Sequence, residues 1–171
     1  MVWWFLTTLT HIDGRSYISQ PISPSTQIIC KVKGPALYSL DTNQAKQWII
    51  IGEDNGHVGF WDYQTQRKVD SIKVSSNRVT CLKFIERKQW IVAGTNNGNV
   101  HVYDYRQMRK ITSFRVGTFE DLVSLAVHPT RPYLLSAGTS MKLWDWDKGW
   151  ECIQTFQDKN HDTTYQVAFN Q

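Results

Sequence analysis

The apolar residues of this chain fall in short runs that favour β-strands. The runs are rich in Val, Ile, Trp and Tyr, and no stretch shows the 3.6-residue apolar period of an amphipathic helix. Four such runs follow one another in the middle of the chain, and they are Arg78–Phe84, Gln89–Ala93, Val100–Tyr103 and Arg109–Phe114. Turn-forming residues separate the runs. The pattern therefore predicts an all-β chain built from four-stranded units.

The four-stranded unit repeats along the chain. Gln47–Val69 and Gln89–Ile111 superpose without a gap, and Pro132–Ile153 is a third copy in phase with them. An aromatic residue followed by Asp ends the third strand of each copy, at spacings of 42 and 41 residues. These pairs are Trp61-Asp62, Tyr103-Asp104 and Trp144-Asp145. A period of about 40–45 residues with Trp-Asp at a strand end is the WD-repeat pattern, so we expect β-propeller blades in which these six residues have structural roles.

The repeats predict about three blades and the first strand of a fourth. Thr164–Asn170 has the pattern of that first strand. A closed propeller needs at least four blades, so we expect a partial WD-repeat propeller over residues 36–171, with open blade edges that favour self-association. Residues 1–35 stay unassigned. Within them, Met1–Leu9 is apolar but has no basic start or cleavage site of a signal peptide, and it predicts a strand.

The loops of the third copy differ from those of the first two. Asn55-Gly56 and Asn97-Gly98 separate the second and third strands, and these residue types predict a tight primed turn with positive φ. In the third copy, Ala137–Leu143 is two residues shorter and has no Asn-Gly, so that hairpin must be rebuilt. The usual His before the first strand is also missing at Val116–Thr118, although Asp121 remains. The buried polar network of this blade should therefore be partial.

Composition and charge narrow the functional classes. The chain of 171 residues has eight Trp, seven Tyr and seven Phe, and its formal net charge is +4. The basic pairs Arg67-Lys68, Arg87-Lys88 and Arg109-Lys110 are scattered, which argues against a nucleic-acid surface. Trp146 and Trp150 are compatible with an exposed partner surface or with packing between blades, and the sequence does not decide between the two.

No set of residues points to catalysis or to a cofactor. Cys30, Cys81 and Cys152 are odd in number and widely spaced, which favours a reducing compartment and buried strand positions. Cys81 with His128 is the one conceivable nucleophile pair, and structural roles are favoured for both. Glu53–Gly56 is better explained as a hairpin turn than as a calcium loop. The five histidines lack zinc spacing, and phosphate-loop and hydrolase motifs are absent. We therefore expect neither an enzyme nor a metal or cofactor site.

Several longer stretches carry a specific resemblance. The chain from about Leu37 to Asn170 resembles the first blades of the N-terminal propeller in the coatomer beta-prime subunit family. The matching stretches are Asp62–Gln66, KFIERKQWIVAG at Lys83–Gly94, LAVHPTRPYLLS at Leu125–Ser136, KLWDWDKGW at Lys142–Trp150 and QVAFN at Gln166–Asn170. The phrase WDWDKGW is much more distinctive than Trp-Asp alone.

The resemblance implies a vesicle-coat component in transport between Golgi and endoplasmic reticulum. Such a protein is cytoplasmic, is peripheral on Golgi membrane and coated vesicles, and has other coat subunits and dilysine cargo tails as partners. Cargo binding in that family implies basic residues where this chain has Ala36, Tyr38, Thr80 and Ser124, none of which is basic, whereas the acidic position is kept at Asp121. The rival hypothesis is a truncated, degenerate paralogue that serves as a scaffold in another complex or has no retained function.

Overall fold

The computed structural model describes residues 8–12, 15–23, 26–32, 37–117, 121–156 and 166–170, with side chains from residue 38 onward. The strands before the repeats are β1 (Thr8–Ile12), β2 (Arg15–Ser23) and β3 (Thr26–Val32). The first blade has β4 (Leu37–Asn43), β5 (Trp48–Glu53), β6 (His57–Asp62) and β7 (Arg67–Lys73). The second has β8 (Val79–Ile85), the 3-10 turn η1 (Glu86–Lys88), β9 (Trp90–Thr95), β10 (Asn99–Asp104) and β11 (Arg109–Arg115). The third has β12 (Ser124–Val127), β13 (Tyr133–Ala137), β14 (Met141–Asp145) and β15 (Glu151–Phe156).

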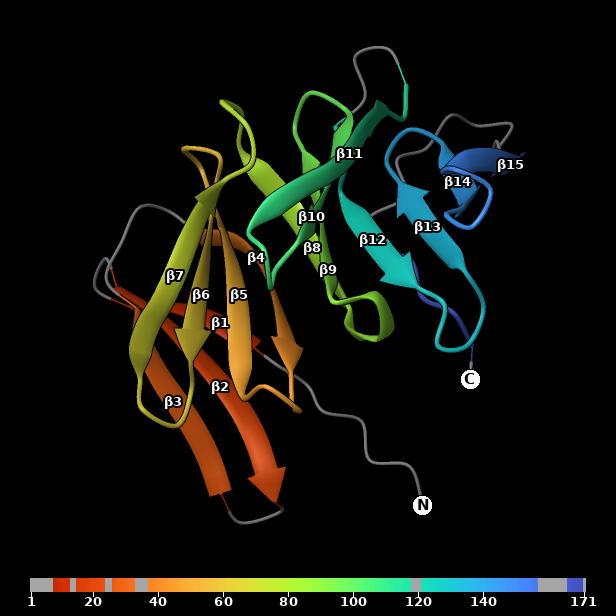
Figure 1. Ribbon diagram of the computed structural model, residues 1–171. Coiled ribbons are helices and arrows are strands. Elements are labelled where there is room, and N and C mark those ends of the chain that lie inside the picture. The colour runs from red at the N-terminus through yellow and green to blue at the C-terminus, as the bar shows by residue number, and fades with distance from the viewer. Residues whose placement is uncertain are drawn as a thin grey trace.

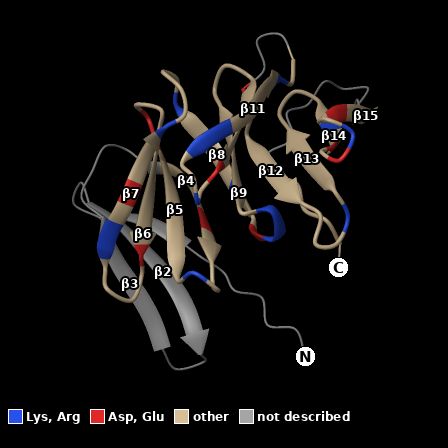
Figure 2. Ribbon diagram, viewed as in Figure 1, with Lys and Arg blue, Asp and Glu red and all other residues tan. Residues whose placement is uncertain are grey.

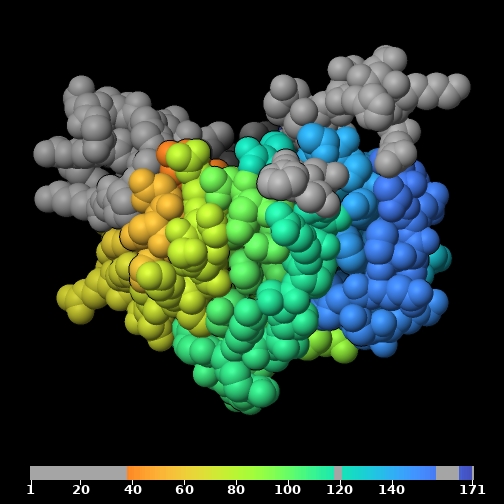
Figure 3. Space-filling model, turned by 90° about the horizontal axis from the view of Figure 1, so that it is seen from above, coloured from red at the N-terminus to blue at the C-terminus, as the bar shows by residue number. Residues whose placement is uncertain are grey.

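Each repeat forms one four-stranded antiparallel sheet whose strands pair in chain order. The first strands, β4, β8 and β12, contact one another and are the inner strands, whereas β7, β11 and β15 are the outer strands (Figure 1). Seen from above, the three sheets follow one another across the molecule in sequence order (Figure 3). This is the arrangement of propeller blades, and it confirms the predicted all-β fold with three WD-type blades.

The blades pack face to face through two apolar clusters. We call the side of a blade that looks toward the next blade its forward face and the opposite side its rear face. Successive residues of one strand lie on opposite faces of the sheet. Val92 on β9 is in the cluster with blade 3, whereas its neighbours Ile91 and Ala93 are in the cluster with blade 1. The forward face of blade 1 supplies Ile50, Val58 and Phe60 to the first cluster. The corresponding forward residues of blade 2 are Val92, Val100 and Val102.

The turn type predicted for the Asn-Gly hairpins is wrong. Among the described residues, Gly56 and Gly98 have φ of 80° and 76°, but neither Asn55 nor Asn97 has positive φ, as a type I′ turn requires. The Gly56 amide donates to the Glu53 carbonyl at 3.3 Å. The reason is loop length: three residues separate the two strands, and such loops form an ordinary turn closed by a left-handed glycine. The hairpin of blade 3 is shorter, as expected: its last strand pair, Ala137–Met141, encloses three residues, whereas the equivalent pair Gly52–Val58 of blade 1 encloses five.

The segment predicted to start a fourth blade lies beside β12. The Val167 amide donates to Ser124 Oγ at 3.3 Å, and the rings of Phe169 and His128 are 4.8 Å apart. Residues 166–170 therefore lie next to the inner strand β12, just as β12 lies next to β8. Within the described chain they pair with no strand, so the ladder of this predicted strand is not formed. Thr164 and Tyr165 lie outside the described residues, as do residues 1–7 of the predicted N-terminal strand.

The region before the repeats also contains strands. Residues 8–32 form an antiparallel sheet of β1, β2 and β3, connected to β4 by residues 33–36. The sequence left residues 1–35 unassigned, so this sheet was not expected. The domain boundary at residue 36 stays a prediction.

Candidate interaction surfaces

The three Asp residues of the repeated Trp-Asp pattern close the turn between the third and fourth strands. Asp62 Oδ1 accepts the amides of Gln64 and Thr65 at 2.9 and 2.8 Å. Asp104 and Asp145 accept the equivalent amides of their own turns. The hydrogen bond from the Thr65 amide is the main cause that lowers the pKa of the Asp62 carboxyl below its usual value of 3.8. These carboxylates are engaged by backbone, which leaves them poor candidates for binding a partner.

The aromatic residue before each Asp contributes to blade packing to a different degree. Tyr103 and Trp144 are buried, and Trp61 is half-buried. Trp144 Nε1 donates to Ser136 Oγ at 2.9 Å, so one bond of the expected polar network exists in blade 3. Asp121, the acidic residue expected near it, is exposed and forms no ion pair within the described residues.

Sequence analysis named Trp146 but missed that an equivalent aromatic residue follows the Asp in every copy. These residues are Tyr63, Tyr105 and Trp146, and all three are buried. Each also donates its amide to the carbonyl of the residue before the second strand, with N–O distances of 3.0–3.1 Å. The signal was present in the triplets Trp-Asp-Tyr, Tyr-Asp-Tyr and Trp-Asp-Trp.

Trp146 and Trp150 pack between blades rather than forming an exposed partner surface. Trp146 is 5% exposed. The ring of Trp150 lies 6.1 Å from Trp90, 5.4 Å from Phe114 and 5.9 Å from Trp146, centroid to centroid. Because Trp90 and Phe114 belong to blade 2, these rings join blades 2 and 3. The packing alternative is therefore the correct one.

One end of the blade array, where the inner strands begin, holds the residues that resemblance assigned to cargo binding. We call this end the rim and define it by Tyr38, Arg78, Thr80, Asp121 and Ser124. Thr80 Oγ1 donates to the carbonyl of Leu122, and Ser124 Oγ accepts the Val167 amide. Both hydroxyls thus bind the next segment along the array. Ala36 lies outside the described residues.

Arg78 is a basic rim residue that the sequence comparison did not anticipate. Its guanidinium carbon lies 4.2 Å from the ring centroid of Tyr38, and both side chains are exposed. A cation over an aromatic face is attracted by the ring quadrupole. The rim therefore presents one guanidinium and the Asp121 carboxylate to solvent. Arg78 is not one of the four positions that the family motif assigns to basic residues, so the resemblance gave no signal for it.

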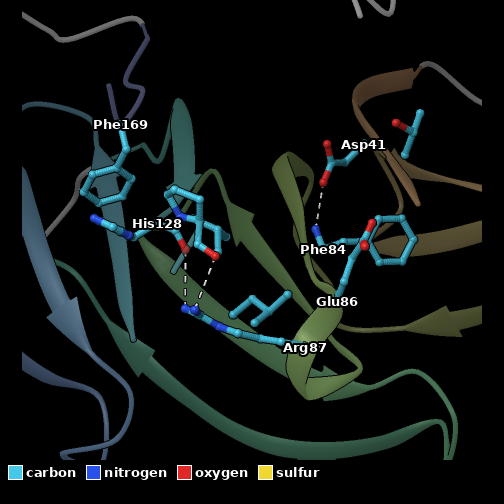
Figure 4. Close-up of a pocket in the computed structure, with 10 residues that line it drawn as sticks. Asp41, Phe84, Glu86, Arg87, His128 and Phe169 are labelled. Atoms are coloured by element: carbon cyan, nitrogen blue, oxygen red, sulfur yellow. Dashed lines mark hydrogen bonds between the residues drawn. The ribbon is translucent and has the colours of Figure 1, made fainter. Parts of the chain in front are cut away.

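A pocket of about 630 Å³ lies at the opposite end, where the inner strands stop (Figure 4). It is lined by Asp41, Thr42, Phe84, Ile85, Glu86, Arg87, Val127, His128, Pro129 and Phe169. Asp41 accepts the Phe84 amide at 2.7 Å and pairs with Lys83 at 3.0 Å. Burial, followed by the nearby charge of Asp41, raises the pKa of Glu86.

The cationic side chain that lines this pocket, Arg87, is held by hydrogen bonds to backbone carbonyls. Arg87 donates to the carbonyls of His128 and Pro129 at 3.3 and 3.4 Å, and also to that of Arg131. Its guanidinium carbon lies 4.7 Å from the Trp146 ring centroid. These contacts join the turn after β8 to the turn after β12. The pocket is thus framed mainly by contacts that join blades.

The described residues offer no nucleophile pair. Cys81 is buried, and burial raises the pKa of its thiol to about 12, so no reactive thiolate forms near neutral pH. Cys152 contradicts the expectation of burial, because it lies exposed on the outer strand β15. The apolar neighbour Ile153 had suggested a covered strand, but all six residues of β15 are exposed. The Cys30 side chain lies outside the described residues.

Three further properties bear on the site. Across the described ranges, no group of three metal-ligating residues comes together. In the same ranges, no helix is long and apolar enough to cross a bilayer. Lys and Arg are scattered over separate elements, including β7, β11 and the turn after β8 (Figure 2).

Comparison with known proteins adds two findings. Residues 23–170 match the family model described as "Nucleolar protein 10-like, N-terminal domain", a β-propeller domain. Over 133 residues the chain is 46% identical to "Coatomer subunit beta'-1" and 45% identical to "Coatomer subunit beta'-2" of Oryza sativa subsp. japonica. It is 44% identical to "Coatomer subunit beta'-1" of Arabidopsis thaliana. Each match covers 77% of this chain and 14–15% of the relative, so the chain spans about one-seventh of their length.

Proposed function

Because the chain belongs to the nucleolar protein 10-like N-terminal propeller family and resembles coatomer beta-prime subunits, we propose that it is a coatomer-like protein-interaction module. It acts by binding other proteins and carries out no chemistry of its own. The observation that carries the proposal is identity of 46% over 133 residues, in a chain whose three blades keep the repeat, the Asp-closed turns and the packing between blades. Fold alone would not suffice, since propellers serve many functions.

The finer proposal is a role in the vesicle coat. The relatives are named as coatomer subunits, and a module that is similar to part of them is suited to assembly with other coat proteins. By this proposal the protein works in the cytoplasm and reaches Golgi membrane and vesicles only through the coat. Its partners are coat subunits before cargo, because the cargo grip implied by resemblance is incomplete.

We further propose that dilysine tails are bound weakly or not at all. Thr80 and Ser124 use their hydroxyls to hold the neighbouring blade or segment, so neither position offers a cation for a terminal carboxylate. Asp121 remains for a lysine ammonium, but an exposed pair of this kind contributes only about 0–1 kcal/mol. Arg78 is the remaining rim cation, and it rests on Tyr38.

The test of coat membership is affinity capture of the tagged full chain from eukaryotic cells, scored for coatomer subunits by mass spectrometry. We expect coatomer subunits to be enriched over a tagged control propeller. A Tyr38→Ser, Arg78→Ser, Asp121→Asn variant serves as the matched control for the rim, and it should still enter the coat. Capture of a different complex without any coatomer subunit would favour the second candidate, a paralogue that serves as a scaffold elsewhere.

Cargo binding is tested separately by titration calorimetry with a peptide ending in a dilysine signal. The matched peptide has both lysines replaced by serine. We expect little or no difference between the two peptides. Low-micromolar binding of the dilysine peptide alone, lost in the rim variant, would show that Arg78 and Asp121 do form a cargo grip.

A further inference from the structure

The forward face of blade 3 is the face that the repeated packing leaves uncovered. Register places Phe156 opposite Met141, as Phe114 is opposite Val100 and Ile72 opposite Val58. Ile72 and Phe114 pack into the two clusters between blades, whereas Phe156 is 37% exposed. The same repeat therefore makes an apolar docking face here, as it does in blades 1 and 2.

A lone segment marks where the next inner strand belongs. Residues 166–170 lie beside β12 through the Val167–Ser124 hydrogen bond and the contact of Phe169 with His128. Amides of successive residues point to opposite sides of an extended segment. Because the Val167 amide points to blade 3, an extended segment would direct the amides of Gln166, Ala168 and Asn170 to the side where a second strand would pair.

The sheet of β1, β2 and β3 has an open edge where an inner strand would pair. β3 connects to inner strand β4 through residues 33–36, just as outer strands β7 and β11 connect to β8 and β12. By this equivalence β3 is the outer strand of its sheet, and β1 is the strand that would pair with an inner strand. No described strand pairs with the free edge of β1. Among the described residues, the sheet thus has three strands that correspond to the three outer positions of a blade, and no described strand takes the innermost position.

The rear face of blade 1 is already covered, so it does not compete for the open face of blade 3. Ile49 and Ile51, which correspond to rear-face residues Ile91 and Ala93, are each 1% exposed. The open forward face and the lone segment lie at the other end of the array, beyond blade 2.

We propose that residues 166–170 of one copy complete the β1–β3 sheet of a second copy as its inner strand. The composite blade would dock on the forward face of blade 3 of the first copy, which continues the repeated interface between blades. β1 is five residues long, which is enough to pair along residues 166–170. Strand directions alternate along each blade, so the pairing is antiparallel, as between β4 and β5. Reciprocal exchange between two copies gives a closed dimer by strand swapping.

The first test is sedimentation of the purified full chain at several concentrations. We expect a particle of twice the 19.9 kDa chain mass that dissociates on dilution. Ala168→Pro removes an amide from the proposed pairing edge and should shift the dissociation constant at least tenfold. Ala168→Val keeps that amide and should leave the dimer intact. Circular dichroism of both variants checks that the three blades are still folded. A compact monomer at all concentrations, or equal dissociation constants for the two variants, would overturn the proposal.

The second test identifies the strands that pair. Antiparallel pairing of two five-residue strands, centre to centre, brings Ala168 of one copy opposite Thr10 of the other. In a Cys152→Ser background, a copy carrying Ala168→Cys and a differently tagged copy carrying Thr10→Cys should form a disulfide when mixed and oxidised. Ala168→Cys alone should not cross-link to itself. A disulfide formed only when both cysteines are in the same copy would show closure within one chain and contradict exchange.

Discussion

At the scale of single residues, the buried imidazole of His101 is the clearest unfavourable polar contribution to stability in the described structure. It lies on β10 and is 9% exposed, and neither ring nitrogen has a hydrogen-bond partner. Burial, and secondly the charge of Lys110, lower its pKa below the ordinary value of 6.5. A buried polar group without a partner costs about 1–3 kcal/mol. Nothing in the run NVHVYD at Asn99–Asp104 distinguishes this histidine from an exposed one, because the alternation of residues indicates the face of the strand but not what covers that face.

Replacing His101 by Leu should remove a pH dependence of stability. The folded pKa is depressed, so as pH falls below 6.5 the unfolded chain takes up a proton before the folded chain does, and the free energy of unfolding decreases. Above 6.5 this contribution is fully retained. Urea unfolding of the wild type and of His101→Leu between about pH 7.5 and pH 5 measures it. The variant should lose less stability on acidification, and a difference between the two proteins that stays constant with pH would refute the assignment.

At the scale of elements, the packing of one blade on the next depends on glycine where the two sheets approach each other most closely. Gly94 on β9 faces blade 3, and a Cβ there would lie 3.2 Å from Leu122 Cβ and would also collide with Cys81 Sγ. The four strands of blade 2 were predictable to within one or two residues, because apolar runs and turn residues define them locally. The backbone of the turns was not: positive φ recurs at Gln66, Met108 and Trp150, three residue types that give no common signal.

Gly94→Ala should destabilise the contact between blades 2 and 3 by about 1–3 kcal/mol, the usual cost of overpacking. Cys81→Ala removes the sulfur that the new methyl group would meet. The double variant should therefore be more stable than the sum of the two single effects predicts. Chemical denaturation of the three variants gives the coupling. Strict additivity would show that Cys81 does not limit the space at Gly94.

At the scale of the whole molecule, contacts between blades recur one repeat apart. Asp41 reaches the Phe84 amide, Thr80 reaches the Leu122 carbonyl and Arg87 reaches the His128 carbonyl, at separations of 43, 42 and 41 residues. The repeat period could be recognised from sequence, and with it the number of blades. These particular bonds could not, because their residue types differ from blade to blade, and their partners are carbonyls and amides that every residue has. The incomplete rim could be predicted, because none of the four family positions is basic in this sequence. The carbonyl and the amide that Thr80 and Ser124 bind could not.

Stability along such an array depends on each blade and its neighbours, so the middle blade should be the most protected. Blade 2 is covered on both faces, whereas the forward face of blade 3 carries exposed Phe156. Hydrogen exchange at low protein concentration should therefore be slowest in β9 and β10 and about tenfold or more faster in β14. Raising the concentration should slow exchange in β14 without changing β9, because a second copy then covers the open face. Equal protection of β9 and β14 at every concentration would mean that blade 3 is already covered within one chain, and strand exchange would be excluded as the cause.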